Sequence, residues 1–181
     1  MKKLLMIIPL VILFCFTIGC QDKEAMAELE EFKAQAEVET QNKNFVRQFM
    51  EDMDKNSGLT NDLLELIADD FKMYIWGSFE PLNKGACHQF IAMLYAAFPD
   101  FNHTMEDMIA EGDKVAARCT VRGTHEGEFQ GMPPTGNKIE YGALQLWIIK
   151  EGKIAELWLQ GDILMMMQQL GMELKPKQGQ K

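Results

Sequence analysis

Apolar residues recur along the chain with two different periods, and the change between them predicts the order of the elements. Up to residue 98 the spacing is that of amphipathic helices, interrupted by one short strand rich in aromatic residues. Beyond residue 98, polar and apolar residues alternate, which is typical of strands with one buried face. We therefore expect helices at 45–53, 61–68, 86–98 and 163–170, and strands at 71–76, 103–111, 114–124, 139–150 and 153–160.

Helices followed by a run of strands indicate an α+β domain, with the helices on one face of an antiparallel sheet. Gly112 and Gly152 lie between neighbouring strands and favour tight hairpin turns. The pattern predicts one domain at 41–174. Residues 20–40 are charged and rich in Ala, Glu and Gln, which predicts a helical or partly disordered tether. A flexible tail is expected at 175–181.

The first twenty residues predict export and lipid attachment. Lys2 and Lys3 precede an unbroken apolar run at 4–16, which has the layout of a signal peptide and is short for a membrane span. The run ends in Thr-Ile-Gly-Cys, which resembles a bacterial lipobox with threonine where leucine is usual. This resemblance implies a lipoprotein signal at 1–19 and a lipid on Cys20 that anchors the exported protein to a membrane of the bacterial cell envelope. An uncleaved anchor and an ordinary secretory signal are the alternatives.

Charge and cysteine content narrow the possible partners. The formal net charge is −9, and no basic patch stands out in the sequence. Such a surface repels phosphate backbones, so no nucleic acid partner is expected. The domain has no Cys-x-x-Cys pair and no histidine–carboxylate cluster at ligand spacing, so no metal is predicted. Cys87 and Cys119 either form a disulfide in an oxidising compartment or are small buried hydrophobic residues.

Several short motifs follow one another between residues 98 and 171. They are Phe98-Pro99-Asp100, Gly123-Thr124-His125, Pro133-Pro134-Thr135-Gly136, Gly152-Lys153-Ile154 and Gln168-Gln169-Leu170-Gly171. Each is common alone, but their order and spacing resemble the SnoaL-like polyketide or ester cyclases over about 45–171. The resemblance implies a cone-shaped α+β barrel of the nuclear-transport-factor-two-like superfold. In that fold a bent antiparallel sheet wraps around about three helices and a deep pocket, and members form homodimers.

Strand alternation divides residues 154–162 into two sets. One set is small and apolar, as expected under helices: Ala155, Leu157, Leu159 and Gly161. The other set is polar and aromatic, and we interpret it as the pocket wall: Glu156, Trp158, Gln160 and Asp162. Asp162 is either the N-cap of the last helix or a general acid/base in an apolar cavity. The family resemblance implies the acid–base role at this position.

Two further polar side chains are candidates for the site. Arg118 lies on the polar face of its strand, where it is either solvated or binds a substrate carboxylate or ester. An uninterrupted strand points His125 to the opposite face, whereas a bulge at Gly123 would reset the alternation. His125 is either structural or a proton shuttle.

The predicted pocket wall contains aromatic residues that could equally belong to the core. These pocket candidates are Tyr74, Trp76, Trp147 and Trp158, together with Gln145. The loop at 127–136, which includes Met132, is either a lid over a hydrophobic ligand or a plain connection between strands.

The resemblance implies acid–base chemistry of the cyclase, isomerase or hydrolase type on a small apolar carbonyl compound, with Asp162 as the base. Arg118, His125 or Tyr74 would stabilise the oxyanion, and no cofactor is expected. Family cyclases often carry one histidine where this chain has Leu157 and another near Tyr74. The alternatives are an envelope lipoprotein that binds a small hydrophobic ligand without catalysis, which export favours, and a purely structural module.

Overall fold

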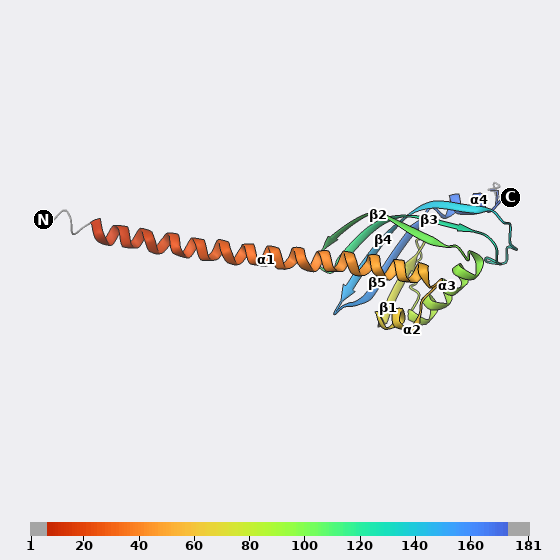
Figure 1. The fold of residues 1–181 in the computed structure, drawn as a ribbon, viewed down its shortest axis with the longest axis horizontal. Helices are drawn as coiled ribbons and strands as arrows, with labels where there is room; N and C mark the ends of the chain where they lie inside the picture. The colour runs from red at the N-terminus through yellow and green to blue at the C-terminus, as the bar shows by residue number, and fades with distance from the viewer. Residues whose placement is uncertain (1–6, 174–181) are drawn as a thin grey trace, which may run out of the picture. The chain divides into compact units, whose positions relative to one another are not determined.

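The structure is a computed structural model that describes the backbone of residues 7–173 and the side chains of residues 23–173 (Figure 1). It divides into two compact units, one up to Val38 and the other from Glu39 onward. Helix α1 (Ile7–Lys55) supplies the described part of the first unit and opens the second. Residues 20–40, predicted to form a tether, are therefore helical, while the side chain of Cys20 lies outside the described side chains.

Within the described part of the chain, no helix combines the length and apolar character that a membrane span needs.

The second unit follows the predicted order of helices and strands. Its further elements are α2 (Asn61–Glu65), β1 (Ile67–Ile75), α3 (Lys84–Ala97), β2 (Asn102–Glu111), β3 (Lys114–Thr124), β4 (Lys138–Lys150), β5 (Lys153–Gly161) and α4 (Ile163–Gln169). The main difference is that α2 ends before the predicted residue 68. The chain becomes extended because the backbone amide of Ile154 in β5 donates to the carbonyl of Leu66, at 2.8 Å. Pairing with a neighbouring strand thus overrides local helical spacing.

One curved sheet organises this unit, with strand order β1-β5-β4-β3-β2. Strands β2 to β5 pair antiparallel, and the long β3 and β4 form its centre. We expected a purely antiparallel sheet, but β1 pairs parallel to β5. The β3–β4 register continues without a break from Lys114 to Thr124, which excludes a bulge at Gly123.

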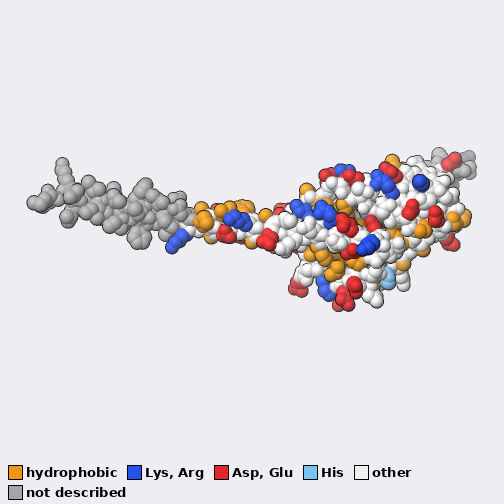
Figure 2. All heavy atoms as spheres, viewed as in Figure 1, with side chains coloured by type: hydrophobic (Ala, Val, Ile, Leu, Met, Phe, Trp, Pro, Cys, Tyr) orange, Lys and Arg blue, Asp and Glu red, His pale blue; other side chains and the backbone are white. Residues whose placement is uncertain are grey.

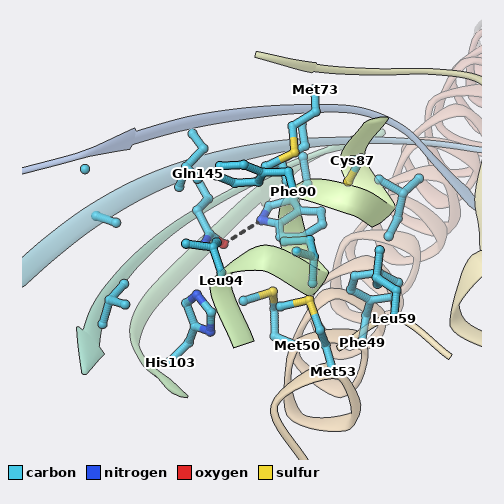
Figure 3. Close-up of a pocket in the computed structure, with 18 of the residues that line it drawn as sticks. Phe49, Met50, Met53, Leu59, Met73, Cys87, Phe90, Leu94, His103 and Gln145 are labelled. Carbon is cyan, nitrogen blue, oxygen red and sulfur yellow. Dashed lines mark hydrogen bonds between the residues drawn. The ribbon is translucent and has the colours of Figure 1, made fainter. Parts of the chain in front are cut away.

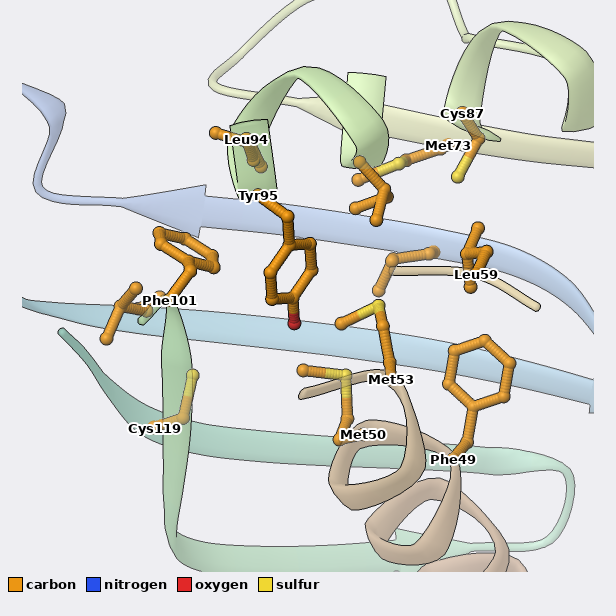
Figure 4. Close-up of a cluster of buried hydrophobic side chains, with 14 of the residues drawn as sticks. Phe49, Met50, Met53, Leu59, Met73, Cys87, Leu94, Tyr95, Phe101 and Cys119 are labelled. Carbon is orange, nitrogen blue, oxygen red and sulfur yellow. The ribbon is translucent and has the colours of Figure 1, made fainter. Parts of the chain in front are cut away.

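The core lies between the concave face of the sheet and the helices α1 and α3. Phe49, Met50 and Met53 of α1 belong to the same buried cluster as Leu94 and Tyr95 of α3 (Figure 4). The ring of Phe49 meets Trp147 of β4 edge-on, with centroids 5.9 Å apart. The C-terminal end of α1 is therefore an integral part of the domain, because its apolar stripe completes the core.

The helix ends are fixed by local signals. α1 stops after Lys55 because Ser57 and Gly58 adopt positive φ angles of 52° and 142°, which a helix does not tolerate. The amide of Gly58 then donates to the carbonyl of Met53 at 3.0 Å. This termination places Asp54 at the last turn of the helix, beside the core.

The connection between β3 and β4 is tied down at its base. The amide of His125 donates to Asn137 and the amide of Gly136 donates to His125, both at 2.9 Å. Phe129 is fully buried, and Met132 is half-buried against it. No residue of this loop lines the cavity described below. The loop is thus a packed connection, and the structure does not place it as a lid.

Acidic and basic side chains are mixed over the visible face of the protein in Figure 2, without a continuous basic region there.

Candidate functional site

A cavity of about 60 Å³ lies inside the cone, between the concave face of the sheet and the helices α1 and α3 (Figure 3). All five strands contribute side chains to its wall. Most of the wall is apolar, with methionine, leucine and aromatic side chains. Few polar groups face this space, and such a combination is typical of small-molecule sites.

The wall contains one histidine, and a carboxylate outside the wall holds it in place. His103, at the start of β2, lines the cavity, and its Nδ1 lies 2.8 Å from Oδ1 of Asp54. The backbone amide of His103 donates to the other carboxylate oxygen of Asp54 at 2.7 Å. The hydroxyl of Tyr95 on α3 also donates to Asp54, at 2.5 Å. Three elements distant in sequence therefore meet at one carboxylate.

Burial strengthens this arrangement. The side chains of His103 and Asp54 are only 9% and 15% exposed. Burial raises the pKa of the Tyr95 hydroxyl, and the hydrogen bond to Asp54 and its negative charge raise it further. Tyr95 consequently keeps its proton at physiological pH and acts as a donor to Asp54.

A second polar group of the wall is the amide of Gln145 on β4. Nε1 of Trp147 donates to Oε1 of Gln145 at 3.1 Å, and both side chains are buried. This bond uses the amide oxygen as an acceptor, and it leaves the NH₂ group of Gln145 available as a donor. Gln145 thus offers a hydrogen-bond donor inside a mostly apolar space.

Three of the predicted pocket residues line the cavity, namely Trp76, Trp147 and Gln145. Trp76 follows β1 and meets Phe90 of α3 edge-on, with centroids 5.5 Å apart. Leu157, at the position where family cyclases often have a histidine, also lines the cavity. The wall is therefore apolar where the resemblance implies a polar group.

The assignment of the two faces of β5 needs correction. From Glu156 onward the alternation is as predicted, but its apolar set Leu157, Leu159 and Gly161 faces the cavity. The start of β5 differs, because the β4–β5 register shifts between Ile148 and Ile149, so Ile154 lines the cavity and Ala155 does not. Trp158, of the polar set, is 40% exposed and stacks on Tyr74 of β1 at 3.8 Å between centroids. The reason is that the helices cover the concave face, so the face under the helices is also the pocket wall. Tyr74 and Trp158 lie outside the cavity.

Arg118 also lies on the outer face of the sheet. Its guanidinium is exposed and pairs with the carboxylate of Asp107 on β2 through Nε at 3.0 Å and through Nη2. Asp107 raises the pKa of Arg118 through this hydrogen bond and its charge. The structure therefore places Arg118 as a solvated cross-strand partner, away from the cavity wall.

His125 is buried on the inner side but outside the cavity wall. Its ring stacks on Phe98 at 5.2 Å between centroids, and Nδ1 accepts the amide proton of Thr135 at 3.2 Å. Nε2 is buried without a hydrogen-bond partner among the described residues. These contacts give His125 a structural position, in which it holds the β3–β4 connection.

Asp162 caps the last helix. Its Oδ1 accepts the amide proton of Met165 at 2.9 Å, and the residue is exposed. The preceding residue, Gly161, lines the cavity, whereas Asp162 does not. The geometry is thus that of an N-cap, and the acid–base role of Asp162 stays a prediction.

The two cysteines of the domain are buried and free. Burial raises the pKa of the Cys87 thiol to about 12 and that of Cys119 to about 11, the latter aided by Asp54 and Glu106. Both thiols therefore stay protonated at neutral pH. Among the described residues, no three His, Cys, Asp or Glu side chains gather where they could hold a metal ion.

Sequence reasoning missed the Asp54–His103–Tyr95 cluster, although two signals pointed to it. Asp54 follows Val46 and Met50 at intervals of one helical turn, so it continues the buried stripe of α1. His103 alternates with Met105 on the inner side of β2. A charged residue on a buried stripe needs a partner, and strand alternation offered His103.

A cone of curved sheet around helices and an enclosed apolar cavity define the nuclear-transport-factor-two-like class of α+β proteins. The model of the SnoaL-like polyketide cyclase family matches residues 44–170. The chain belongs to this family, whose chemistry supports a cofactor-independent role of the cyclase or isomerase type.

Solved structures agree with this membership. IdmH, a candidate polyketide cyclase from Streptomyces antibioticus, is 31% identical over 73% of this chain and 99% of its own, with a TM-score of 0.64. Two structures at 23% identity and a TM-score of 0.67 share the fold. One is a candidate SnoaL-like polyketide cyclase from Jannaschia, which covers 76% of this chain and 96% of its own. The other is AclR, a candidate hydroxylase from Streptomyces galilaeus, which covers 76% of this chain and 86% of its own. No curated protein matches the chain.

Proposed function

We propose that this protein carries out acid–base chemistry on a small apolar carbonyl compound, as a lipid-anchored member of the bacterial cell envelope. The observation that carries the proposal is the apolar cavity inside the cone, whose wall contains one histidine and one buried amide donor. An apolar cavity strengthens each polar interaction inside it. The NH₂ group of Gln145 would donate to the carbonyl oxygen as negative charge develops there. The family membership supports the same class of chemistry.

Asp162 is the residue that the family resemblance proposes as the base. It directly follows Gly161 of the cavity wall, but its carboxylate is bound to the amide of Met165. For Asp162 to act on a substrate, the first turn of α4 has to release this cap.

The first test is Asp162→Asn. Asparagine caps a helix about as well as aspartate, so the midpoint of thermal unfolding should change little. If Asp162 is the base, turnover of the carbonyl substrate should fall at least ~100-fold while ligand affinity is kept. Turnover would be followed beside a melting curve for each variant. A variant with full activity would remove Asp162 from the mechanism.

The second candidate function is ligand binding without turnover. Leu157 favours it, since this side chain makes the wall apolar where family cyclases often have a histidine. Mass spectrometry of small molecules that remain bound through native purification separates the two functions. A carbonyl compound that the protein converts supports catalysis, and one recovered unchanged after incubation supports binding alone.

Lipid attachment at Cys20 predicts a direct labelling result. Radioactive palmitate should enter the wild-type protein, and Cys20→Ala should abolish the labelling because the acylated thiol is lost. Cys15→Ala, five residues before Cys20 and inside the apolar run, is the matched control and should still label. Labelling of Cys20→Ala would contradict the lipoprotein proposal.

The outer face of the sheet supports the proposed homodimer. Leu144, Leu146 and Trp158 are 61%, 36% and 40% exposed there, and Leu146 pairs with Trp158 across β4 and β5. Charged pairs such as Arg122 with Glu140 border this patch on the same face. An apolar patch with a polar rim is typical of an interface between two copies.

The homodimer is tested by Leu146→Glu, which should halve the protein mass measured by light scattering after gel filtration in detergent. A buried charge without a partner opposes association, so the dissociation constant should rise at least ~100-fold. Phe79→Glu is the control, because Phe79 is 94% exposed in the connection between β1 and α3, outside the patch on β4 and β5. Dimers that persist in Leu146→Glu would exclude this face as the interface.

A further inference from the structure

We propose that His103 is the acid–base residue of the cavity, and that Asp54 and Tyr95 position it. The inference rests on the proposed function and deepens it. It assigns the role of the base to His103 on β2, whereas the family resemblance assigns this role to Asp162, the N-cap of α4. It follows from the hydrogen bonds around His103 and from its place in the cavity wall.

The imidazole ring is held in one orientation. Both carboxylate oxygens of Asp54 bind His103, one at the backbone amide (2.7 Å) and one at Nδ1 (2.8 Å). The Tyr95 hydroxyl donates to the same carboxylate at 2.5 Å and fixes it from α3. Phe101 meets the ring edge-on, with centroids 5.1 Å apart. A base held in this way needs no reorganisation before it reacts.

The same contacts decide which ring nitrogen can react. An ionised carboxylate only accepts hydrogen bonds, so Nδ1 carries the proton of the neutral ring and Nε2 keeps its lone pair. In Figure 3 the His103 ring lies on the same side of the view as the Gln145 amide, with Leu94 drawn between them. Since Nδ1 binds Asp54, Nε2 is the ring nitrogen that this bond leaves available. His103 and Gln145 both line the cavity, so a base and a hydrogen-bond donor meet in one apolar space.

This pair fits a small ketone or ester with a hydrogen on the carbon next to its carbonyl group. The lone pair of Nε2 takes that proton, the electrons of the C–H bond form a C=C bond, and the carbonyl π electrons move to oxygen. The resulting enolate oxygen accepts a hydrogen bond from the NH₂ group of Gln145. Asp54 stabilises the imidazolium, which returns its proton to carbon. No other reactant is consumed.

Neither of the other two histidines of the chain lines the cavity. His88 lies exposed on α3, and His125 stacks on Phe98 away from the wall. His103 contacts Asp54 on α1, and Tyr95 on α3 binds the same carboxylate. Tyr141 on β4 and Cys87 on α3 line the same cavity, and Cys119 lies on the neighbouring strand β3. Burial raises the pKa of each of these tyrosine and cysteine side chains, so they stay protonated and Asp54 supplies the charge that faces the ring.

The experiment uses the full chain in detergent and cyclopentanone as the probe. In D₂O, removal and return of the α-proton replaces hydrogen by deuterium, and proton NMR follows the loss of the signal. Wild type should exceed the buffer rate, and His103→Asn should lower the rate at least ~100-fold. His88→Asn is the matched control and should keep the wild-type rate. Circular dichroism checks that each variant is folded.

Asp54 acts through His103, so its test needs a measurement that a simple loss of stability would leave unchanged. Asp54→Asn should lower the exchange rate at least ~10-fold, because the ring loses the partner that selects its tautomer. Nitrogen-15 NMR should find the ring proton of His103 on Nδ1 in wild type but no longer confined to Nδ1 in Asp54→Asn, since an amide can donate as well as accept at this position. A tautomer that is unchanged in Asp54→Asn would remove Asp54 from this role.

The remaining outcomes separate this inference from the proposed function. Exchange that persists in His103→Asn and is lost in Asp162→Asn overturns the inference and leaves the proposed function in place. Wild type without exchange above buffer overturns both. If His103→Asn does not fold, nitrogen-15 NMR of the wild-type histidines decides. A proton on Nδ1 of His103, with an Nε2 signal that shifts on addition of cyclopentanone, supports the inference, and the opposite tautomer overturns it.

Discussion

Gly127→Ala is expected to destabilise the domain by about 3 kcal/mol or more. A Cβ atom at this position would lie 2.1 Å from the carbonyl oxygen of Ala96 and 3.0 Å from Cα of Ala97. Both are backbone atoms of α3, so no side chain can rotate to make room. The amides of Glu126 and Gly127 both donate to the carbonyl of Ala97 at 3.0 Å, and the clash would break this attachment.

Urea unfolding followed by tryptophan fluorescence measures this loss of stability. Gly142→Ala is the matched control, since a Cβ atom there has nothing within 4 Å and the backbone is in a strand. The control should be within about 0.5 kcal/mol of wild type. Equal unfolding midpoints for the two variants would contradict the close approach of the β3–β4 connection to α3.

Asp54→Ala is expected to cost about 3 kcal/mol of unfolding free energy, because it leaves buried donors without an acceptor. Three groups would lose Asp54 as their hydrogen-bond partner: the hydroxyl of Tyr95, the backbone amide of His103 and Nδ1 of His103. The last turn of α1 would also lose its polar attachment to α3 and β2.

The control for this loss is Asp107→Ala. Asp107 also pairs with a side chain of a neighbouring element, the guanidinium of Arg118, but Asp107 is 71% exposed, and its removal should leave the unfolding midpoint nearly unchanged. Asp54→Asn should lie between wild type and Asp54→Ala, since an amide oxygen still accepts one or two of these bonds. If Asp54→Ala unfolds at the wild-type urea concentration, the cluster contributes nothing to the fold.

Local patterns predicted most of the fold because its strands obey them. β3 lies within its predicted bounds, since alternation is regular and Gly112, with a φ of 57°, permits the turn before it. The boundary between α2 and β1 was not predicted, because the backbone of Leu66 pairs with Ile154, a residue far along the chain. Local spacing contains no information about such a partner.

The site was harder to predict than the fold. Alternation separated the two faces of β5 correctly from Glu156 onward, but only the packed structure shows that the helices and the cavity share one face. The patterns of α1 and β2 place Asp54 and His103 each on an inner face, but neither pattern contains the contact between these two elements. Trp76, Trp147 and Gln145 could be named beforehand because large or amphipathic side chains on inner positions are common in pocket walls.

The parallel pairing of β1 with β5 has a consequence for how the protein folds. β2 to β5 can assemble one hairpin after another, whereas β1 has to find β5 across all of them, and such contacts form slowly. Until then the edge of β5 is unpaired and open to association with other chains. Met73 of β1 and the adjoining Trp76 belong to the cavity wall, so the wall is complete only after this last pairing. A small molecule that fills the cavity would therefore favour the fully folded chain and slow its unfolding.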